Sequence, residues 1–186
     1  MKKVVLLGDS IRLLGYGRST EEALSGEFSV WQPDDNCRFA QYTLRMLFDK
    51  QKDIEGADVI HWNNGLWDVF KLFDDGEFTP IDIYVAEVVR IAKLLKARAK
   101  VVIFATTTPV NPKYKYISNE DVARYNAAVV PELIKLGVEI NDLYSLVSEN
   151  IEKYICDDLV HLSPDGIVVC KERVESVIRN ALSTVD

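Results

Sequence analysis

The chain has 186 residues, of which 48% are hydrophobic and 27% are charged, and its formal net charge is −7. This length and composition predict one soluble domain over residues 1–186, large enough to bury a substantial core. Because an acidic protein repels phosphate groups, the charge argues against nucleic acid or an anionic membrane as the main partner.

Cysteine usage and the amino terminus favour a reducing compartment. Cys37, Cys156 and Cys170 form no Cys-x-x-Cys pair, so we expect reduced thiols rather than disulfides. The apolar run Val4–Leu7 is too short for the core of a signal peptide, and no other run is long enough to span a bilayer. We therefore expect a cytoplasmic protein with no stable membrane association.

Four short apolar runs predict buried parallel strands. Uninterrupted runs of this kind, in place of an alternating pattern, are typical of strands that are covered on both faces. The runs are Val4–Leu7, Asp58–Trp62, Val101–Ala105 and Val138–Asn141.

Helical patterns separate and follow these strands. Three capping signals mark helix starts, namely Thr79-Pro80, Ser118 with Asp121, and Ser163-Pro164. We expect Pro131 to kink or end the second of these helices. Residues 11–35 are less regular, and we expect loops around a short helix there.

The alternation of strands and helices predicts an α/β fold. We expect a three-layer α/β/α sandwich with a flavodoxin-like parallel sheet. Ligands of such folds bind at the carboxyl ends of the strands. Residues just after the apolar runs are therefore the candidates for chemistry.

Gly8-Asp9-Ser10 directly follows the first predicted strand. Glycine permits a tight turn, and the serine would begin a helix whose free N–H groups suit an oxyanion. Ser10 is thus a candidate nucleophile. Because Asp and Ser are also common helix caps, the tripeptide taken alone fits an ordinary cap better.

A serine nucleophile needs a base, and the chain has two histidines. His61 lies inside an apolar run, which predicts a packed core residue. His161 lies in the loop before the final helix, and Asp158 precedes it by three residues. This spacing can bring the carboxylate to one imidazole nitrogen and leave the other facing a serine. The alternative is an exposed acidic loop with an incidental histidine.

Two other loops carry groups that can donate hydrogen bonds to an oxyanion. Asn63-Asn64-Gly65 follows the second strand, where a plain polar turn is the alternative. Asn36-Cys37-Arg38 forms the other candidate loop. Aromatic residues in or near the loops suit a sugar ring, although core packing is their commoner role; they are Tyr16, Trp31, Trp62 and Trp67.

These residues resemble the SGNH hydrolases, also called the GDSL-like lipase/acylhydrolase family, over nearly the whole chain. Gly8-Asp9-Ser10 is similar to the first block of the family, and Asp158-Leu-Val-His161 is similar to its last block, the DxxH motif. The resemblance implies that Ser10 is the nucleophile, His161 the general base and Asp158 the residue that orients the histidine.

Two blocks depart from the family pattern and indicate a divergent subgroup. The third block of the family is Gly-x-Asn-Asp, whose Asn donates to the oxyanion, whereas this chain has Gly65-Leu66-Trp67-Asp68. Asn63 or Asn64 would take over that role. The second block of the family supplies a glycine N–H, which the N–H of Cys37 would replace beside that of Ser10.

The resemblance implies a serine esterase that forms an acyl-serine intermediate without a metal or cofactor. We expect small acyl esters, such as acetyl esters of carbohydrates, or short-chain lipid-like esters. The substrate would contact Asp9, Asn36, Arg38, Gly65 and Trp67.

Two other classes of protein remain as alternatives. One is a non-catalytic ester- or carbohydrate-binding module on the same fold. The other is a flavodoxin-like nucleotide- or flavin-binding domain, which the lack of a glycine-rich phosphate loop argues against. The residues do not predict an oligomeric state.

Overall fold

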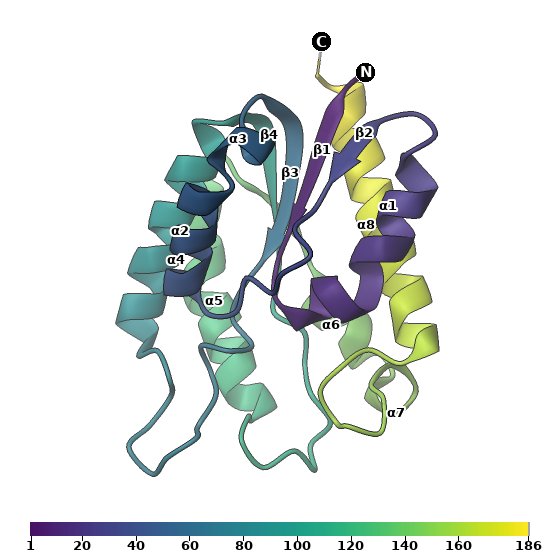
Figure 1. Cartoon of the computed structure of the whole chain (residues 1–186). Coiled ribbons are helices and arrows are strands. Elements are labelled where there is room, and N and C mark those ends of the chain that lie inside the picture. The colour runs from purple at the N-terminus through teal and green to yellow at the C-terminus, as the bar shows by residue number, and fades with distance from the viewer. Residues whose placement is uncertain (186) are drawn as a thin grey trace.

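The structure of the chain is a computed structural model that describes residues 1–185. A five-stranded parallel sheet, in the order β2-β1-β3-β4-β5, forms its centre (Figure 1). The strands are β1 Lys3–Leu7, β2 Ser29–Trp31, β3 Ala57–Asn63, β4 Ala99–Ala105 and β5 Glu139–Asn141. The expected domain extends to residue 186, which lies outside the described residues.

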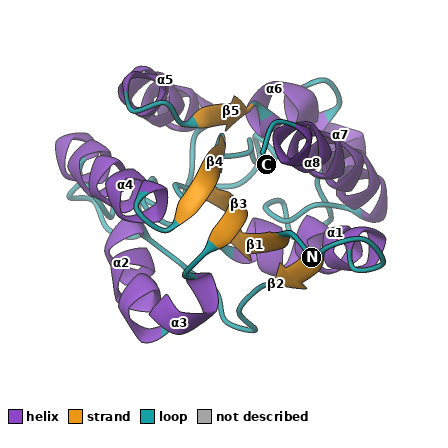
Figure 2. Cartoon of the chain, turned by 90° about the horizontal axis from the view of Figure 1, so that it is seen from above, coloured by secondary structure: helices purple, strands orange, loops and turns teal. Residues whose placement is uncertain are grey.

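Helices cover both faces of the sheet. Seen from above, α2, α4 and α5 lie on one face, and α1, α6 and α8 lie on the other (Figure 2). The helices are η1 Ile11–Tyr16, α1 Gly17–Leu24, α2 Ala40–Asp49, α3 Gln51–Ile54, α4 Ile81–Lys96, α5 Asn119–Lys135, α6 Leu143–Ser148, α7 Ile151–Tyr154 and α8 Pro164–Ser183. The three-layer α/β/α architecture predicted from the sequence is therefore confirmed. Among residues 1–185, no helix is both long and apolar enough to cross a membrane.

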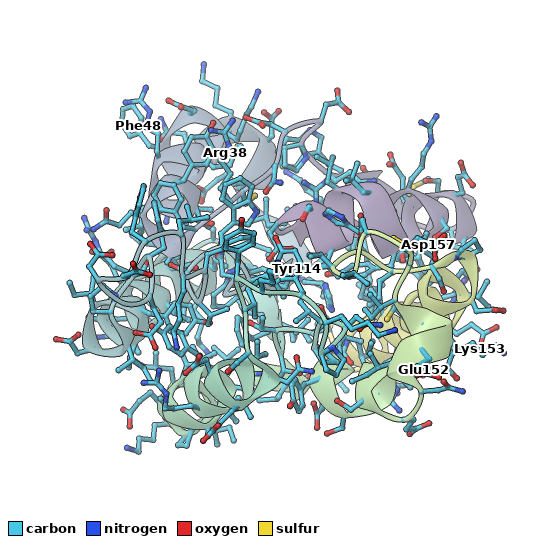
Figure 3. The ribbon with its side chains drawn as sticks, turned by 90° about the horizontal axis from the view of Figure 1, so that it is seen from below. Arg38, Phe48, Tyr114, Glu152, Lys153 and Asp157 are labelled. Carbon is cyan, nitrogen blue, oxygen red and sulfur yellow. The ribbon has the colours of Figure 1, made fainter. Side chains whose placement is uncertain are left out.

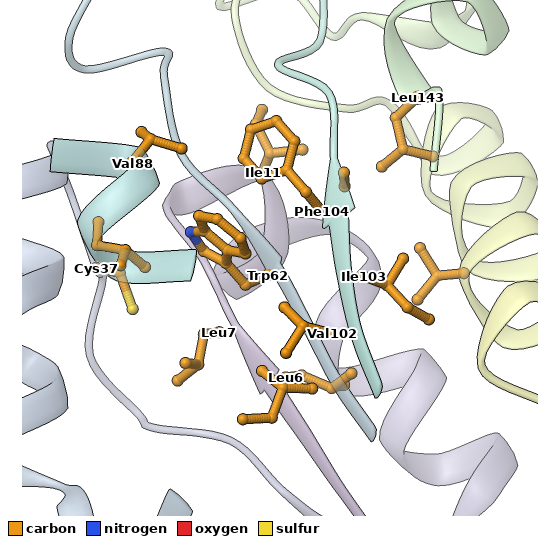
Figure 4. Close-up of a cluster of buried hydrophobic side chains, with 14 of the residues drawn as sticks. Leu6, Leu7, Ile11, Cys37, Trp62, Val88, Val102, Ile103, Phe104 and Leu143 are labelled. Atoms are coloured by element: carbon orange, nitrogen blue, oxygen red, sulfur yellow. The ribbon is translucent and has the colours of Figure 1, made fainter. Parts of the chain in front are cut away.

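The apolar runs became the central strands because both faces of the sheet are buried. Val4 pairs with Val59 and Leu7 with Trp62, so β1 and β3 end together. Trp62 packs its ring against Phe104 of β4, with 4.7 Å between the ring centroids. Figure 4 shows these two rings in the apolar cluster. Burial of this surface is the main favourable contribution to the stability of the fold.

Residues 11–35 are more regular than the sequence indicates. The chain forms η1, a π-helical segment, followed by α1 and the edge strand β2. The expectation of loops around one short helix was therefore wrong in part. β2 has only three residues, none of them buried, and it exists because Lys3 and Val5 of β1 pair with Ser29 and Trp31. Such a strand is defined by its partner and leaves no apolar run in the sequence.

Two of the three predicted caps are confirmed. The Ser118 hydroxyl accepts the N–H of Asp121 at the start of α5, and the Ser163 hydroxyl accepts the N–H of Gly166 at the start of α8. The cap predicted at Thr79 was wrong, because Pro80 occupies the cap position of α4. The helix α5 also does not end at Pro131 but continues to Lys135.

The loop after β3 is held to the helix α2 through Asp68. Both carboxylate oxygens of Asp68 accept the N–H of Ala40, the first residue of α2, at 3.1 and 3.2 Å. A carboxylate at a helix amino terminus is favoured by the helix dipole. Burial nevertheless dominates, and it raises the pKa of Asp68 from 3.8 to about 7.

We expect Asp68→Asn to change how stability depends on pH. Because the pKa of Asp68 is raised on folding, the folded state binds this proton more tightly than the unfolded chain does. The contribution to stability is fully present below about pH 4 and is lost as the pH rises through about 7. The free energy of unfolding of the parent protein, measured by urea denaturation, should therefore fall relative to that of Asp68→Asn by roughly 1.4 kcal/mol per pH unit in that window.

The exposed Asp74 offers a matched control, since Asp74→Asn removes a carboxylate from the same connection between β3 and α4. If the free energy of unfolding changes with pH in the same way for the parent protein and for Asp68→Asn, the raised pKa of Asp68 is contradicted.

Candidate active site

A cavity of about 630 Å3 opens at the carboxyl ends of the strands. Its polar lining residues are Ser10, Asn36, Asp158 and His161, which come from three separate segments of the chain. Figure 3 looks onto this end of the molecule, where Tyr114 lies near the middle of the view. The topology therefore brings Ser10 and the Asp158–His161 loop to one site.

The turn after β1 presents Ser10 at the amino terminus of η1. Gly8 has φ +156°, and a Cβ at this position would lie 1.9 Å from Oδ1 of Asn63. Only glycine lets the strand end approach Asn63 this closely. The Ser10 residue is 8% exposed and borders the cavity.

Asp9 points into the protein, away from the cavity. Its Oδ1 accepts the N–H of Ile11 at 2.9 Å and the side-chain amide of Asn63 at 2.8 Å. The residue is 1% exposed, and burial raises the pKa of its carboxyl group. The geometry thus gives Asp9 a role in holding the turn and leaves it almost no surface for the expected contact with substrate.

His161 and Asp158 form a short hydrogen bond, with 2.6 Å between Nδ1 and Oδ2. The other carboxylate oxygen, Oδ1, accepts the N–H groups of Val160 and His161, each at 2.9 Å. Partial burial raises the pKa of Asp158, but these N–H groups, Cys156 and the His161 ring outweigh it and hold that pKa well below its usual range. The carboxylate is therefore ionised at neutral pH and fixed in orientation.

Backbone contacts hold the loop that carries this pair. The N–H of Cys156 donates to the His161 carbonyl at 2.8 Å, and Ile155 bridges to Leu162. The Ser163 hydroxyl also donates to the Lys153 carbonyl at 2.6 Å. The loop is thus closed on itself and tied to the start of α8, which positions His161 beside the cavity.

Asn63 and Asn64 are both buried, and each side-chain amide donates a hydrogen bond within the protein. The Asn63 amide donates to Asp9, and its oxygen accepts the Tyr16 hydroxyl at 2.9 Å. The Asn64 amide donates to the Arg38 carbonyl at 2.9 Å, and its oxygen accepts the Trp62 indole N–H at 2.8 Å. Neither side chain borders the cavity. Their expected role as oxyanion donors receives no support from this arrangement.

Cys37 is also engaged within the protein. Its N–H donates to the Gly8 carbonyl at 3.0 Å, so the donor expected for the oxyanion has an acceptor already. Burial raises the pKa of the Cys37 thiol to about 11. A thiol that stays protonated at neutral pH is a poor nucleophile.

Asn36 is the residue of this loop that borders the cavity. Its Oδ1 accepts the N–H of Arg38 at 2.7 Å, which fixes the amide group and turns its NH2 away from Arg38. Arg38 itself lies outside the cavity lining, and its guanidinium stacks over the Tyr42 ring at 4.4 Å. The structure therefore places Asn36 at the site, and it places Arg38 beside the site.

Gly65 and Trp67 differ in their relation to the cavity. Gly65 has φ +138°, and a Cβ there would lie 2.0 Å from the Thr107 hydroxyl, so this glycine serves a close backbone approach. Trp67 is 38% exposed and borders the cavity. Of the two residues expected to contact substrate, only Trp67 has the exposed surface to do so.

His61 is a core residue, as the sequence predicts. It is fully buried, its Nε2 lies 3.1 Å from the Asn141 amide, and burial lowers its pKa to about 3. Trp62 and Tyr16 are also fully buried, which confirms their predicted packing role. Within residues 1–185, no group of three or more His, Cys, Asp and Glu side chains is arranged to hold a metal ion.

Most of the apolar lining residues have no distinctive signal in the sequence. Leucine, valine and aromatic residues in connecting segments resemble core residues in any sequence pattern. The lining residues not singled out from the sequence include Leu14, Phe70, Leu72, Phe78, Tyr114 and Val160.

No protein-family model matches the chain, and no curated protein matches its sequence. Solved structures do match its fold. The lipase/acylhydrolase from Enterococcus faecalis has a TM-score of 0.80 and 16% sequence identity over 97% of this chain and 96% of that chain. The acetyl xylan esterase AlAXEase has a TM-score of 0.78 and 18% identity over 95% and 99%.

A third match is a catalytic mutant of Axe2, an acetylxylan esterase from Geobacillus stearothermophilus, in which a serine is replaced by alanine. Its TM-score is 0.73, with 14% identity over 93% of this chain and 92% of that chain. At these identities the likeness establishes architecture, and activity has to be argued from the site. The chain therefore has an SGNH hydrolase-like fold.

Proposed function

We propose that the protein is a serine esterase in which Ser10 attacks the ester carbonyl, His161 is the general base and Asp158 orients the histidine. The observation that carries this proposal is the 2.6 Å bond from Asp158 to His161 Nδ1 at the edge of a cavity that Ser10 also borders. Because Asp158 engages Nδ1, Nε2 is the ring nitrogen left to take a proton from Ser10.

The reaction would proceed through an acyl-serine. His161 accepts the Ser10 proton during attack and passes it to the leaving alcohol, and water then hydrolyses the acyl-serine with the same histidine as base. Asp158 stays ionised and stabilises the imidazolium that forms at each step. Within residues 1–185, the His161 ring makes its side-chain hydrogen bond to Asp158, and a contact between a base and its nucleophile often tightens only when substrate is bound.

Two groups are best placed to stabilise the oxyanion. The Ser10 N–H lies at the amino terminus of η1, where the first N–H groups have no acceptor within the helix. Asn36 borders the same cavity, and the Arg38 N–H fixes the orientation of its amide through Oδ1. Of the other expected donors, Asn63, Asn64 and Cys37 already donate to Asp9, Arg38 and Gly8.

The class of ester is a finer proposal. Two of the matched structures are acetyl xylan esterases, which supports the acetyl esters of carbohydrates expected from the sequence. The mostly apolar lining of the cavity supports a more apolar substrate.

The first test is hydrolysis of p-nitrophenyl acetate and butyrate by the parent protein, Ser10→Ala and His161→Ala. Removal of either residue should lower kcat by about a thousandfold or more, because the nucleophile and its base act as a unit. A fluorophosphonate probe should label the parent protein and leave Ser10→Ala unlabelled. Background rates from all three proteins together with no labelling would contradict the esterase and indicate a non-catalytic module.

Replacement of the orienting carboxylate should lower the rate without unfolding the protein. Asp158→Asn keeps the shape of the side chain but favours the wrong histidine tautomer, so kcat should fall by roughly a hundredfold to ten-thousandfold. Asp157→Asn is the matched control. It removes the carboxylate next to Asp158 in the chain, whereas the hydrogen bond to His161 comes from Asp158. Full activity in Asp158→Asn, or an equal loss in Asp157→Asn, would contradict the assignment.

The role of Asn36 is tested by two substitutions. Asn36→Asp keeps an oxygen that can accept the Arg38 N–H but has no N–H to donate, whereas Asn36→Ala removes both functions. Loss of one oxyanion donor typically lowers kcat by about a hundredfold, so both variants should show a large fall in kcat with a smaller change in KM. If both keep the parent kcat, Asn36 is not a donor, and Asn63 or Asn64 would have to rearrange to take the role.

A further inference from the structure

We infer that the substrate carries a long aliphatic or an aromatic group, which binds along an apolar wall of the cavity. This inference rests on the proposed function, since it concerns the ester that the Ser10 site accepts. It differs from the acetyl esters of carbohydrates expected from the sequence, and it replaces the short chain of the lipid-like esters also expected there with a long aliphatic or an aromatic group.

Most of the cavity is apolar. Eight of its twelve lining residues have aliphatic or aromatic side chains, and they come from four segments of the chain. These eight residues form the apolar wall: Leu14, Leu66, Trp67, Phe70, Leu72, Phe78, Tyr114 and Val160. Leu14 lies on η1, Trp67 and Phe78 lie between β3 and α4, Tyr114 follows β4, and Val160 precedes His161. A volume of about 630 Å3 is in the usual range for sites that enclose a small molecule.

Several of these apolar side chains are exposed in the absence of a substrate. Leu14 is 64% exposed, Phe78 is 49% exposed and Leu72 is 48% exposed. All three border the cavity that contains Ser10 and His161. Grouped exposed apolar side chains favour an apolar occupant, because contact with it removes their surface from water. Because these side chains line the same cavity as Ser10 and His161, the ester substrate is the occupant that we infer.

Contacts between two connecting segments hold the apolar wall in place. The ring of Phe70 packs edge-on against Tyr114 at 5.8 Å between centroids, and the N–H of Lys71 donates to the Tyr116 carbonyl at 2.8 Å. The Lys71 ammonium pairs with Asp121 of α5 at 2.6 Å. These contacts join the connection after β3 to the connection after β4, so the apolar surface exists before the substrate arrives and little ordering is needed on binding.

Few polar groups remain for a sugar. The polar lining side chains are Ser10, Asn36, Asp158 and His161, and the proposed reaction uses all four. The Trp67 indole and the Tyr114 hydroxyl are the remaining polar groups among the lining residues. Hydroxyl groups that lose water without new hydrogen bonds are costly to bury, so a carbohydrate would bind here poorly compared with a hydrocarbon chain.

The test compares four esters with the parent protein by pH-stat titration. Methyl octanoate and heptyl acetate are isomers. Methyl octanoate carries the long chain on the acyl side, and heptyl acetate carries it on the alcohol side. Methyl acetate lacks the chain, and xylose tetraacetate represents a sugar ester. Burial of one methylene group favours binding roughly fourfold, so at least one isomer should exceed methyl acetate in kcat/KM by more than tenfold. The isomer that is hydrolysed faster shows whether the acyl side or the alcohol side of the ester binds against the apolar wall.

Variants of the wall provide the second arm. Leu14→Ala combined with Phe78→Ala should lower the ratio of kcat/KM for the preferred isomer over methyl acetate by about tenfold. Phe73→Ala is the matched control, because Phe73 is 75% exposed at the tip of the same connection and does not border the cavity. The control should keep the parent ratio. A ratio that is unchanged in the double variant, or that falls equally in the control, would overturn the inference.

The outcomes separate this inference from the proposed function. Faster hydrolysis of methyl acetate or xylose tetraacetate than of both isomers would overturn the apolar substrate and leave the esterase intact. No hydrolysis of any ester and no labelling of Ser10 by a fluorophosphonate would overturn the esterase, and the inference with it. Thermal unfolding of each variant checks that the compared proteins are folded.

Discussion

The hydrogen bond from the Asn63 amide to the Asp9 carboxylate fixes the turn on which the candidate site depends. This bond joins the ends of β1 and β3. The Tyr16 hydroxyl donates to the oxygen of the same Asn63 side chain and so holds it in position. Gly8 is required at this point because a side chain would collide with Asn63. With Asp9 held inward by this bond, the next residue, Ser10, starts η1 at the edge of the cavity. A buried hydrogen-bonded group thus positions the neighbouring residue that borders the cavity.

The opposite side of the cavity is built on local contacts. Asp158 accepts the N–H groups of two following residues and also holds the His161 ring. One carboxylate therefore shapes the loop and orients the His161 ring. The start of α8 supports the loop, since the Ser163 hydroxyl both caps α8 and donates to the Lys153 carbonyl of α7. Such coupling explains why three residues of separation suffice to form the pair.

Polar and apolar parts of the cavity have different origins. Ser10 lies at the start of η1, while Asn36 and the Asp158–His161 pair lie in the connections before α2 and α8. The parallel topology gathers these distant segments at the carboxyl ends of the strands. The apolar wall comes largely from the connection between β3 and α4, which is tied to α5 through Lys71 and Asp121. The Phe70, Tyr114 and Tyr116 rings pack together where the two connections meet. Most of the apolar wall therefore comes from the connections after β3 and β4, whereas Leu14 lies on η1, which follows Ser10, and Val160 directly precedes His161.

The amino-acid sequence is sufficient to predict the α/β architecture, the four apolar strands, the caps at Ser118 and Ser163, and the pairing of Asp158 with His161. These features depend on local patterns: an apolar run, a capping residue, or two groups three residues apart. The grouping of Ser10 with that pair came from the resemblance to the SGNH hydrolases. Strand β2, the hydrogen bonds of the Asn63 and Asn64 amides, and the apolar wall emerge only when the chain is folded. An edge strand needs its partner, a side-chain amide can donate to any acceptor that folding brings near, and an apolar residue in a connection has the same local pattern whether it is buried in the core or borders a cavity.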